Sequence, residues 1–87
     1  NVQILYLIVL KRNEFKGFAK QNNLIQGTWV NIYFTGNVPI IVTGFIQSLE
    51  EDMIEIKLYP DDSYIYIDFA YKGIPKNLNK ILLANSF

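Results

Sequence analysis

The stretch GTWVNIYFTGNVPIIVTGFIQSLEEDMIEIKLYP, residues 27–60, decides the fold. From Thr28 onward apolar and polar residues alternate, which places Val30, Ile32 and Phe34 on one face of the chain. A period of two is typical of a half-buried β-strand. Glycine and asparagine follow at positions 36 and 37, and this pair favours a tight hairpin turn. The sequence therefore predicts two antiparallel strands, with the second over residues 38–49.

Gly44 lies in the middle of that second strand. A glycine inside a strand indicates a bulge or a bend, and a bend of this kind lets a small sheet curl. Three further strands are predicted downstream, over residues 53–59, 64–69 and 80–84. We therefore expect a mainly β protein, built as a small, strongly bent antiparallel barrel of four to six strands.

The N-terminal part of the chain has a different pattern. Residues 1–12 contain a run that is apolar on both faces, which predicts a leading strand covered on both sides. A buried helix is the alternative for so short a run. Over residues 13–22, Phe15, Phe18 and Ala19 recur at helical spacing, which predicts one short helix. The barrel itself then occupies residues 28–84. Since the chain begins at Asn1 inside an apolar run, we expect a single domain that is a segment of a longer chain.

The composition argues against most kinds of catalysis. Among 87 residues there is no cysteine and no histidine, so the chain has no disulfide, no thiol nucleophile, no Cys/His zinc site and no His-based triad. The acidic clusters do not match a calcium-binding loop, and no glycine-rich phosphate loop is present. We expect a protein that is not an enzyme and that binds no metal, cofactor or small-molecule substrate. No apolar run is long enough for a membrane-spanning helix, so no membrane association is expected either.

Charged residues are sorted along the chain although the formal net charge is zero. Residues 11–20 and 72–80 are basic, whereas residues 50–68 are acidic. Three interpretations fit this pattern: solvated strand ends, complementarity to a neighbouring protein, or nucleic acid held by the two basic segments folded together. A neutral balance is unusual for a nucleic-acid-binding domain.

Residues 27–60 resemble the first motif of the Sm-like proteins. The similar features are the turn glycine Gly36, the glycine Gly44 within the next strand, and Asp52 before an apolar strand. The resemblance implies a Sm-like or Src-homology-3-like barrel, and the same strand order occurs in Tudor-like and KOW-like barrels. The RNA-contacting asparagine of the Sm motif would fall near Glu55, and the second, Arg-Gly motif has only Lys72-Gly73 as a counterpart.

A second resemblance covers residues 52–75, and the run IDFAYKGIP at 67–75 is its core. It is similar to a segment of long, uncharacterised proteins of nucleocytoplasmic large DNA viruses. The richness in Asn, Ile, Lys and Tyr, which have A/T-rich codons, agrees with such a source. The resemblance implies a piece of a large virion protein, and it implies an intracellular or virion location.

Aromatic residues make up 15% of the chain and supply the candidate contacts. Five phenylalanines are assigned to the core: Phe15, Phe18, Phe34, Phe45 and Phe69. Four rings are assigned to outward faces as a partner-binding surface: Trp29, Tyr33, Tyr64 and Tyr66. Such rings fit a protein interface, a base-stacking surface or a cover for another segment of the chain.

We therefore expect a non-catalytic structural or protein-interaction module that binds a protein partner or other copies of itself. The acidic loop at 50–52 would add to the binding surface, and strand edges at 1–10 or 80–84 could pair with another chain. The alternative is a nucleic-acid-binding barrel of the Sm, Tudor or KOW type. Its phosphate contacts would be Lys11, Arg12, Lys16, Lys20, Lys72, Lys76 and Lys80. Ring-forming self-assembly is a third possibility.

Overall fold

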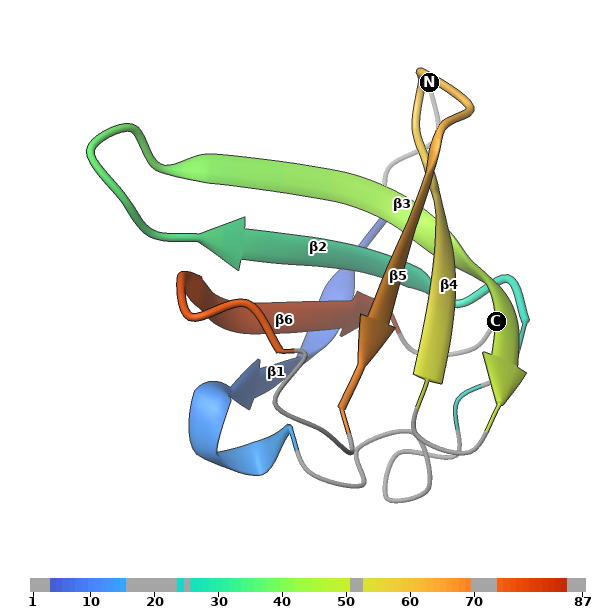
Figure 1. The fold of residues 1–87 in the computed structure, drawn as a ribbon. Helices are drawn as coiled ribbons and strands as arrows, with labels where there is room; N and C mark the ends of the chain where they lie inside the picture. The colour runs from blue at the N-terminus through green and yellow to red at the C-terminus, as the bar shows by residue number, and fades with distance from the viewer. Residues whose placement is uncertain (1–3, 16–23, 25, 51–52, 70–73, 85–87) are drawn as a thin grey trace.

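The computed structural model describes residues 4–15, 24, 26–50, 53–69 and 74–84, and in them it shows one antiparallel sheet of six strands (Figure 1). The strands are β1 (Tyr6–Lys11), β2 (Trp29–Phe34), β3 (Ile40–Glu50), β4 (Met53–Leu58), β5 (Tyr64–Asp68) and β6 (Leu78–Ala84). Their order across the sheet is β1-β6-β2-β3-β4-β5. A short 3-10 turn, η1 (Arg12–Glu14), follows β1. No helix in the described ranges is long and apolar enough to cross a membrane.

The long strand β3 belongs to two ladders. Its first half pairs with β2, from Ile40 opposite Phe34 to Phe45 opposite Trp29, and its second half pairs with β4. Gly44 lies in both ladders, and a Cβ atom added there would lie 2.3 Å from the Lys57 carbonyl oxygen. The register then shifts between Ile46 and Ser48. The predicted irregularity in this strand is therefore present, and β4 and β5 run across the direction of β2 and β6 (Figure 1).

The inward side of both ladders forms a single core. Alternate residues of β2 and β4 point inward, and Val30, Ile32, Ile54 and Ile56 are all buried. Ile81 and Leu83, which are alternate residues of β6, join them. Leu78 joins the same core, because the register of the β2–β6 ladder shifts between Tyr33 and Phe34. Phe15 and Phe69 close the core edge to face, with ring centroids 5.8 Å apart. The alternation predicted from the sequence is confirmed for β2 and β4.

Closure into a barrel was a wrong expectation, since the sheet is neither closed nor strongly curled. In the described residues β1 and β5 are the two edges, and no ladder joins them. The apolar side chains of the β2 and β4 ladders already meet in one core with Phe15 and Phe69, so burial of the core does not require the edges to pair.

The strand order also corrects one predicted edge. Residues 80–84 belong to β6, which lies between β1 and β2 and is therefore an interior strand. The other predicted edge, within residues 1–10, is confirmed for β1, which pairs with β6 of the same domain. A sequence pattern does not distinguish these cases, because the final strand inserts between two strands that are distant from it along the chain.

The predicted helix over 13–22 is not seen where the structure describes the chain. Residues 13 and 14 belong to η1, where the Lys11 backbone N–H donates to Glu14 Oε1 at 3.0 Å. Residues 16–22, with Phe18, lie outside the described residues. The Glu14 carboxylate accepts this hydrogen bond from the backbone three residues earlier, and the contact supports a single tight turn at the end of β1.

Candidate interaction surface

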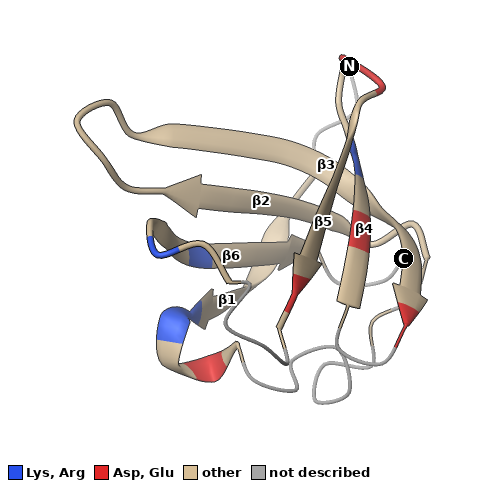
Figure 2. Ribbon diagram, in the orientation of Figure 1, with Lys and Arg blue, Asp and Glu red and all other residues tan. Residues whose placement is uncertain are grey.

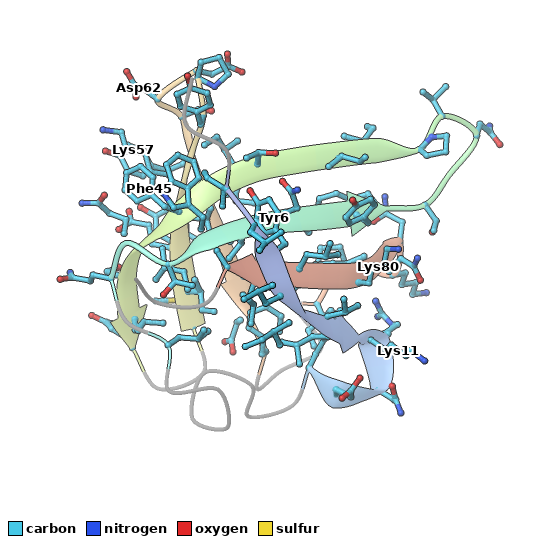
Figure 3. All side chains as sticks on the ribbon, turned by 180° about the vertical axis from the view of Figure 1, so that it is seen from behind. Tyr6, Lys11, Phe45, Lys57, Asp62 and Lys80 are labelled. Atoms are coloured by element: carbon cyan, nitrogen blue, oxygen red, sulfur yellow. The ribbon has the colours of Figure 1, made fainter. Side chains whose placement is uncertain are left out.

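A row of side chains crosses four strands on the outer side of the sheet. Trp29 of β2 is opposite Phe45 of β3, Phe45 is opposite Lys57 of β4, and Lys57 is opposite Tyr64 of β5. Their neighbours along each strand, such as Val30 and Ile56, face the core. We call Trp29, Phe45, Lys57 and Tyr64 the cross-strand row; Figure 3 shows Phe45 and Lys57 close together within it.

Three rings pack together at one end of this row. The Trp29 ring makes edge-to-face contacts with Phe45 at 5.3 Å and with Tyr59 at 5.8 Å between centroids. Tyr59 follows β4, and its backbone N–H donates to the Thr43 carbonyl at 2.9 Å. Its side chain is nevertheless 64% exposed. Backbone pairing thus holds the aromatic cluster in place, with Trp29 and Phe45 half-buried and Tyr59 open to solvent.

Phe45 was assigned to the core, and this assignment is wrong. Gly44 and Ile46 face inward, so the residue between them faces outward and lies against Trp29. The sequence signal was available, because Gly44 and Ile46 bracket Phe45 in the strand period. Tyr59 was missed altogether, since it lies beyond the end of β4 and its contact with Trp29 depends on the three-strand arrangement.

A second, polar row lies further along β4 and β5. Glu55 Oε1 accepts a hydrogen bond from Ser48 Oγ at 3.0 Å, and Glu55 Oε2 accepts one from the Tyr66 hydroxyl at 2.6 Å. The bond to Glu55 and the negative charge of that carboxylate raise the pKa of Tyr66 above its usual value. Tyr66 remains 65% exposed, so its ring is oriented by Glu55 but uncovered.

The outward assignment of Tyr64 and Tyr66 is confirmed, and Trp29 joins Tyr64 in the cross-strand row. Tyr33 also faces outward but lies near the far end of β2, opposite Ile41 and Lys80. The Lys80 ammonium lies 4.6 Å from the centroid of its ring. Burial, and secondarily the Tyr33 phenol, raise the pKa of Tyr6, which lies in front of β2 in Figure 3. Tyr33 thus belongs to a different part of the outer side.

Basic residues from the two ends of the chain meet near Tyr33. Lys11 of β1 is directly opposite Lys80 of β6, and both lie at the same end of the sheet (Figure 3). Figure 2 shows in blue the basic positions of η1 and β6 at this end. Lys76 is exposed in the turn before β6. Arg12 has a structural role, because its Nη1 donates to the carbonyls of Pro75 at 2.8 Å and Leu78 at 2.6 Å. Lys16, Lys20 and Lys72 lie outside the described residues.

The acidic residues do not form a cation site. Within the described ranges, no group of three or more His, Cys, Asp or Glu residues is placed to hold a metal ion. Glu50 is exposed at the end of β3, and residues 51–52 of the predicted acidic loop lie outside the described part. At the β4–β5 turn, Asp62 Oδ1 lies 3.7 Å from the Lys57 ammonium, which connects this turn to the cross-strand row.

Edge strand β1 exposes a second apolar area. Leu5, Leu7 and Val9 are 63%, 54% and 50% exposed, whereas Leu10 on the inward side is buried.

Comparison with known proteins gives no match to any family model, curated protein or solved structure. The geometry of these two areas is therefore the basis for assigning a function.

Proposed function

We propose that this chain is a non-catalytic protein-interaction module whose contact surface is the cross-strand row together with Tyr59 and Tyr66. One observation carries the proposal: the Trp29, Phe45 and Tyr59 rings are packed together on the outer side of the sheet while Tyr59 and Tyr64 stay exposed. Aromatic side chains are enriched in the cores of protein interfaces and among the residues that contribute most to binding.

Pre-ordering of these rings favours tight binding. Immobilising a side chain on association costs roughly 0.5–1.5 kcal/mol, and rings already fixed by edge-to-face contacts avoid part of that cost. Lys57, Glu55 and Tyr66 surround the rings with groups that form hydrogen bonds or ion pairs. An apolar centre with a polar rim is the usual organisation of a protein interface.

The proposed setting is a large viral protein, inside the cell or in the virion. Its support is the abundance of Asn, Ile, Lys and Tyr, which have A/T-rich codons, and the resemblance over residues 52–75, of which 70–73 lie outside the described part. The proposed lack of enzymatic activity is supported by the absence of histidine and cysteine from the sequence.

The alternative function, nucleic-acid binding in the manner of Sm, Tudor or KOW domains, is favoured by one observation. Lys11 and Lys80 face each other across a ladder, and like charges directly opposite are destabilising unless an anion lies between them. Tyr33 beside Lys80 could stack on a base. The zero net charge and the engagement of Arg12 by two backbone carbonyls favour the protein-interaction proposal instead.

A photo-reactive phenylalanine derivative placed at position 64 tests the proposal. The chain would be expressed in its native cells or particles, and cross-linked peptides would be identified by mass spectrometry. We expect cross-links from position 64 to one defined protein surface. Val38 is the matched control, since it is 75% exposed in the β2–β3 connection and lies off the proposed surface. Equal yields from both positions, or cross-links from position 64 to nucleic acid, would overturn the proposal.

Titration with a single-stranded oligonucleotide at low salt separates the two functions. Trp29 is the only tryptophan, so its fluorescence reports directly on the cross-strand row. We expect no saturable change in fluorescence and no change in mass by light scattering. A complex that weakens steeply with added salt would instead support phosphate contacts by the lysines.

A further inference from the structure

The hairpin that joins β2 to β3 extends beyond the rest of the sheet (Figure 1). Strand β4 pairs with β3 only from Gly44 onward, and the β2–β6 ladder ends at Phe34. The side chains of Val38, Ile40 and Ile41 are 75%, 54% and 57% exposed. We call these three residues the hairpin tip. Val38 is the most exposed large hydrophobic residue in the described part of the chain.

The apolar side chains surround the hairpin tip instead of forming a patch on one side of it. Ile40 and Ile41 are consecutive in β3, so they point to opposite sides of the hairpin. A partner of fixed shape could cover both sides only by enclosing the tip, whereas a fluid apolar phase covers them without a matching cavity. Pro39, between Val38 and Ile40, has no backbone N–H that would need a partner in such a phase.

Behind the hairpin tip, a row of side chains across the sheet changes from apolar to basic. Tyr33 of β2 is opposite Ile41 of β3 on one side and Lys80 of β6 on the other. Lys80 is in turn opposite Lys11 of β1. Figure 3 shows Lys80 and Lys11 on the side of the molecule from which the hairpin projects. An aromatic ring and two ammonium groups therefore lie close behind the apolar tip.

A third ammonium group and a lack of acidic groups complete this end of the molecule. Lys76 is exposed in the turn before β6, and this turn is held against the hairpin because the Asn77 carbonyl accepts from the Thr35 backbone N–H at 2.7 Å. Residues 26–49 and 74–84 contain no Asp or Glu. Figure 2 shows the acidic positions of β3, β4 and β5 away from the hairpin tip. Glu14 of η1 is engaged by the Lys11 backbone N–H.

We propose that the hairpin tip inserts into the interface of a membrane that contains anionic lipids, while Lys11, Lys76 and Lys80 contact the headgroup phosphates. Interfacial binding combines buried apolar side chains with attraction of basic groups to anionic lipids, and this end of the molecule presents both. Tyr33 lies where tyrosine is enriched, at the level of the headgroups. Nucleic acid would neutralise the lysines but leave the apolar tip in water. The lack of a long apolar run argues only against a spanning helix.

This membrane contact goes beyond the proposed function and uses a separate area. Trp29 and Phe45 of the cross-strand row form the first pair of the β2–β3 ladder, and Phe34 and Ile40 form the last. A membrane-bound chain therefore keeps the cross-strand row free for a protein partner. Cross-linking from position 64 tests that row alone, and vesicle binding tests the hairpin tip alone, so the failure of one proposal is distinguishable from the failure of the other.

Co-sedimentation with vesicles of phosphatidylcholine mixed with phosphatidylserine tests the membrane contact. We expect saturable binding that weakens with added salt and is much weaker on vesicles of phosphatidylcholine alone. Val38→Asp should weaken binding about tenfold or more, because the exposed valine no longer enters the acyl boundary. Ser63→Asp is the matched control, since it adds the same charge at an exposed position in the β4–β5 turn. It should bind as the wild type does, and circular dichroism checks that both variants are folded.

Substitutions of the lysines test the contact with the headgroups. Lys76→Gln and Lys80→Gln should each weaken vesicle binding about fivefold, because each removes one ammonium group from the membrane surface. Lys76→Arg keeps the charge and should keep the affinity. The proposal is overturned if the wild type does not bind the anionic vesicles at low salt, or binds phosphatidylcholine alone equally well. It is also overturned if Val38→Asp binds like the wild type, or if Ser63→Asp is equally impaired.

Discussion

Position 44 has no room for any side chain, so the fold requires glycine there. A Cβ atom there would lie 2.3 Å from the Lys57 carbonyl oxygen and 3.0 Å from the Ile56 side chain. Because the first neighbour is backbone, β3 and β4 would have to move apart. We expect Gly44→Ala to lower the free energy of unfolding by about 2 kcal/mol or more, measured by urea denaturation.

Gly27→Ala is the matched control for this prediction. Gly27 has a φ of +88°, so alanine would be strained there, but nothing lies within 4 Å of the added Cβ. The strain alone should cost about 1 kcal/mol. If both substitutions cost the same, the close approach at Gly44 is not what holds β3 against β4.

Tyr6 gives the fold a dependence on alkaline pH. Burial, and then the neighbouring Tyr33, raise its pKa above the ordinary value of 10.0. The folded chain therefore keeps the phenol proton at a pH where the unfolded chain loses it. The resulting stabilisation is complete below pH 10.0 and is lost as the pH rises through the folded-state pKa. We expect Tyr6→Phe to lose less stability than the wild type above this pH, measured by thermal unfolding in parallel.

Arg12 connects two elements that are far apart in the sequence. Its Nη1 donates to the carbonyls of Pro75 and Leu78, which fixes η1 against the start of β6. Charge-assisted hydrogen bonds contribute about 1.5–3 kcal/mol each when shielded from solvent, and one of these two is exposed. We expect Arg12→Ala to lower the free energy of unfolding by about 1–2 kcal/mol. Lys76 is exposed and follows Pro75 in the turn before β6, so Lys76→Ala should leave the free energy of unfolding almost unchanged. An equal loss of stability in both variants would contradict the structural role of Arg12.

Strands β2 to β5 could be predicted from the sequence because each has one buried face and a recognisable turn after it. Ile54 and Ile56, which alternate with Glu55 and Lys57, are sufficient to define β4. The place of β6 could not be predicted, since its two neighbours, β1 and β2, are the first and second strands among the described residues. Whether the sheet closes into a barrel depends on how the apolar side chains fill the space between the β2–β3 and β3–β4 ladders, and no local sequence pattern carries that information.

The candidate surface was partly predictable for the same reason. Trp29, Tyr64 and Tyr66 could be assigned to the outer side from strand periodicity alone. Their grouping depends on register across β2, β3, β4 and β5, which places Trp29 near Tyr59 but far along β2 from Tyr33. The structural role of Arg12 was equally hidden, because its acceptors are carbonyls more than sixty residues away.

The linear strand order predicts a graded protection of backbone amides over the whole molecule. We expect the slowest hydrogen exchange in β6 and β2, which pair on both sides and carry fully buried Ile32, Leu78 and Leu83. Exchange in β5 should be faster, because one side of that strand is unpaired. Uniform protection across all six strands would contradict this order.

The place of β6 between β1 and β2 has a consequence for biosynthesis. On the ribosome, β2 to β5 emerge in the order in which they pair, so each can join its predecessor as soon as it leaves the exit tunnel. Strand β1 has no such opportunity, since its partner β6 is translated only after β2 to β5. A nascent chain therefore holds an apolar segment without its partner in the sheet until β6 emerges, and that segment is a natural target for a chaperone or for a neighbouring nascent chain on the same messenger RNA.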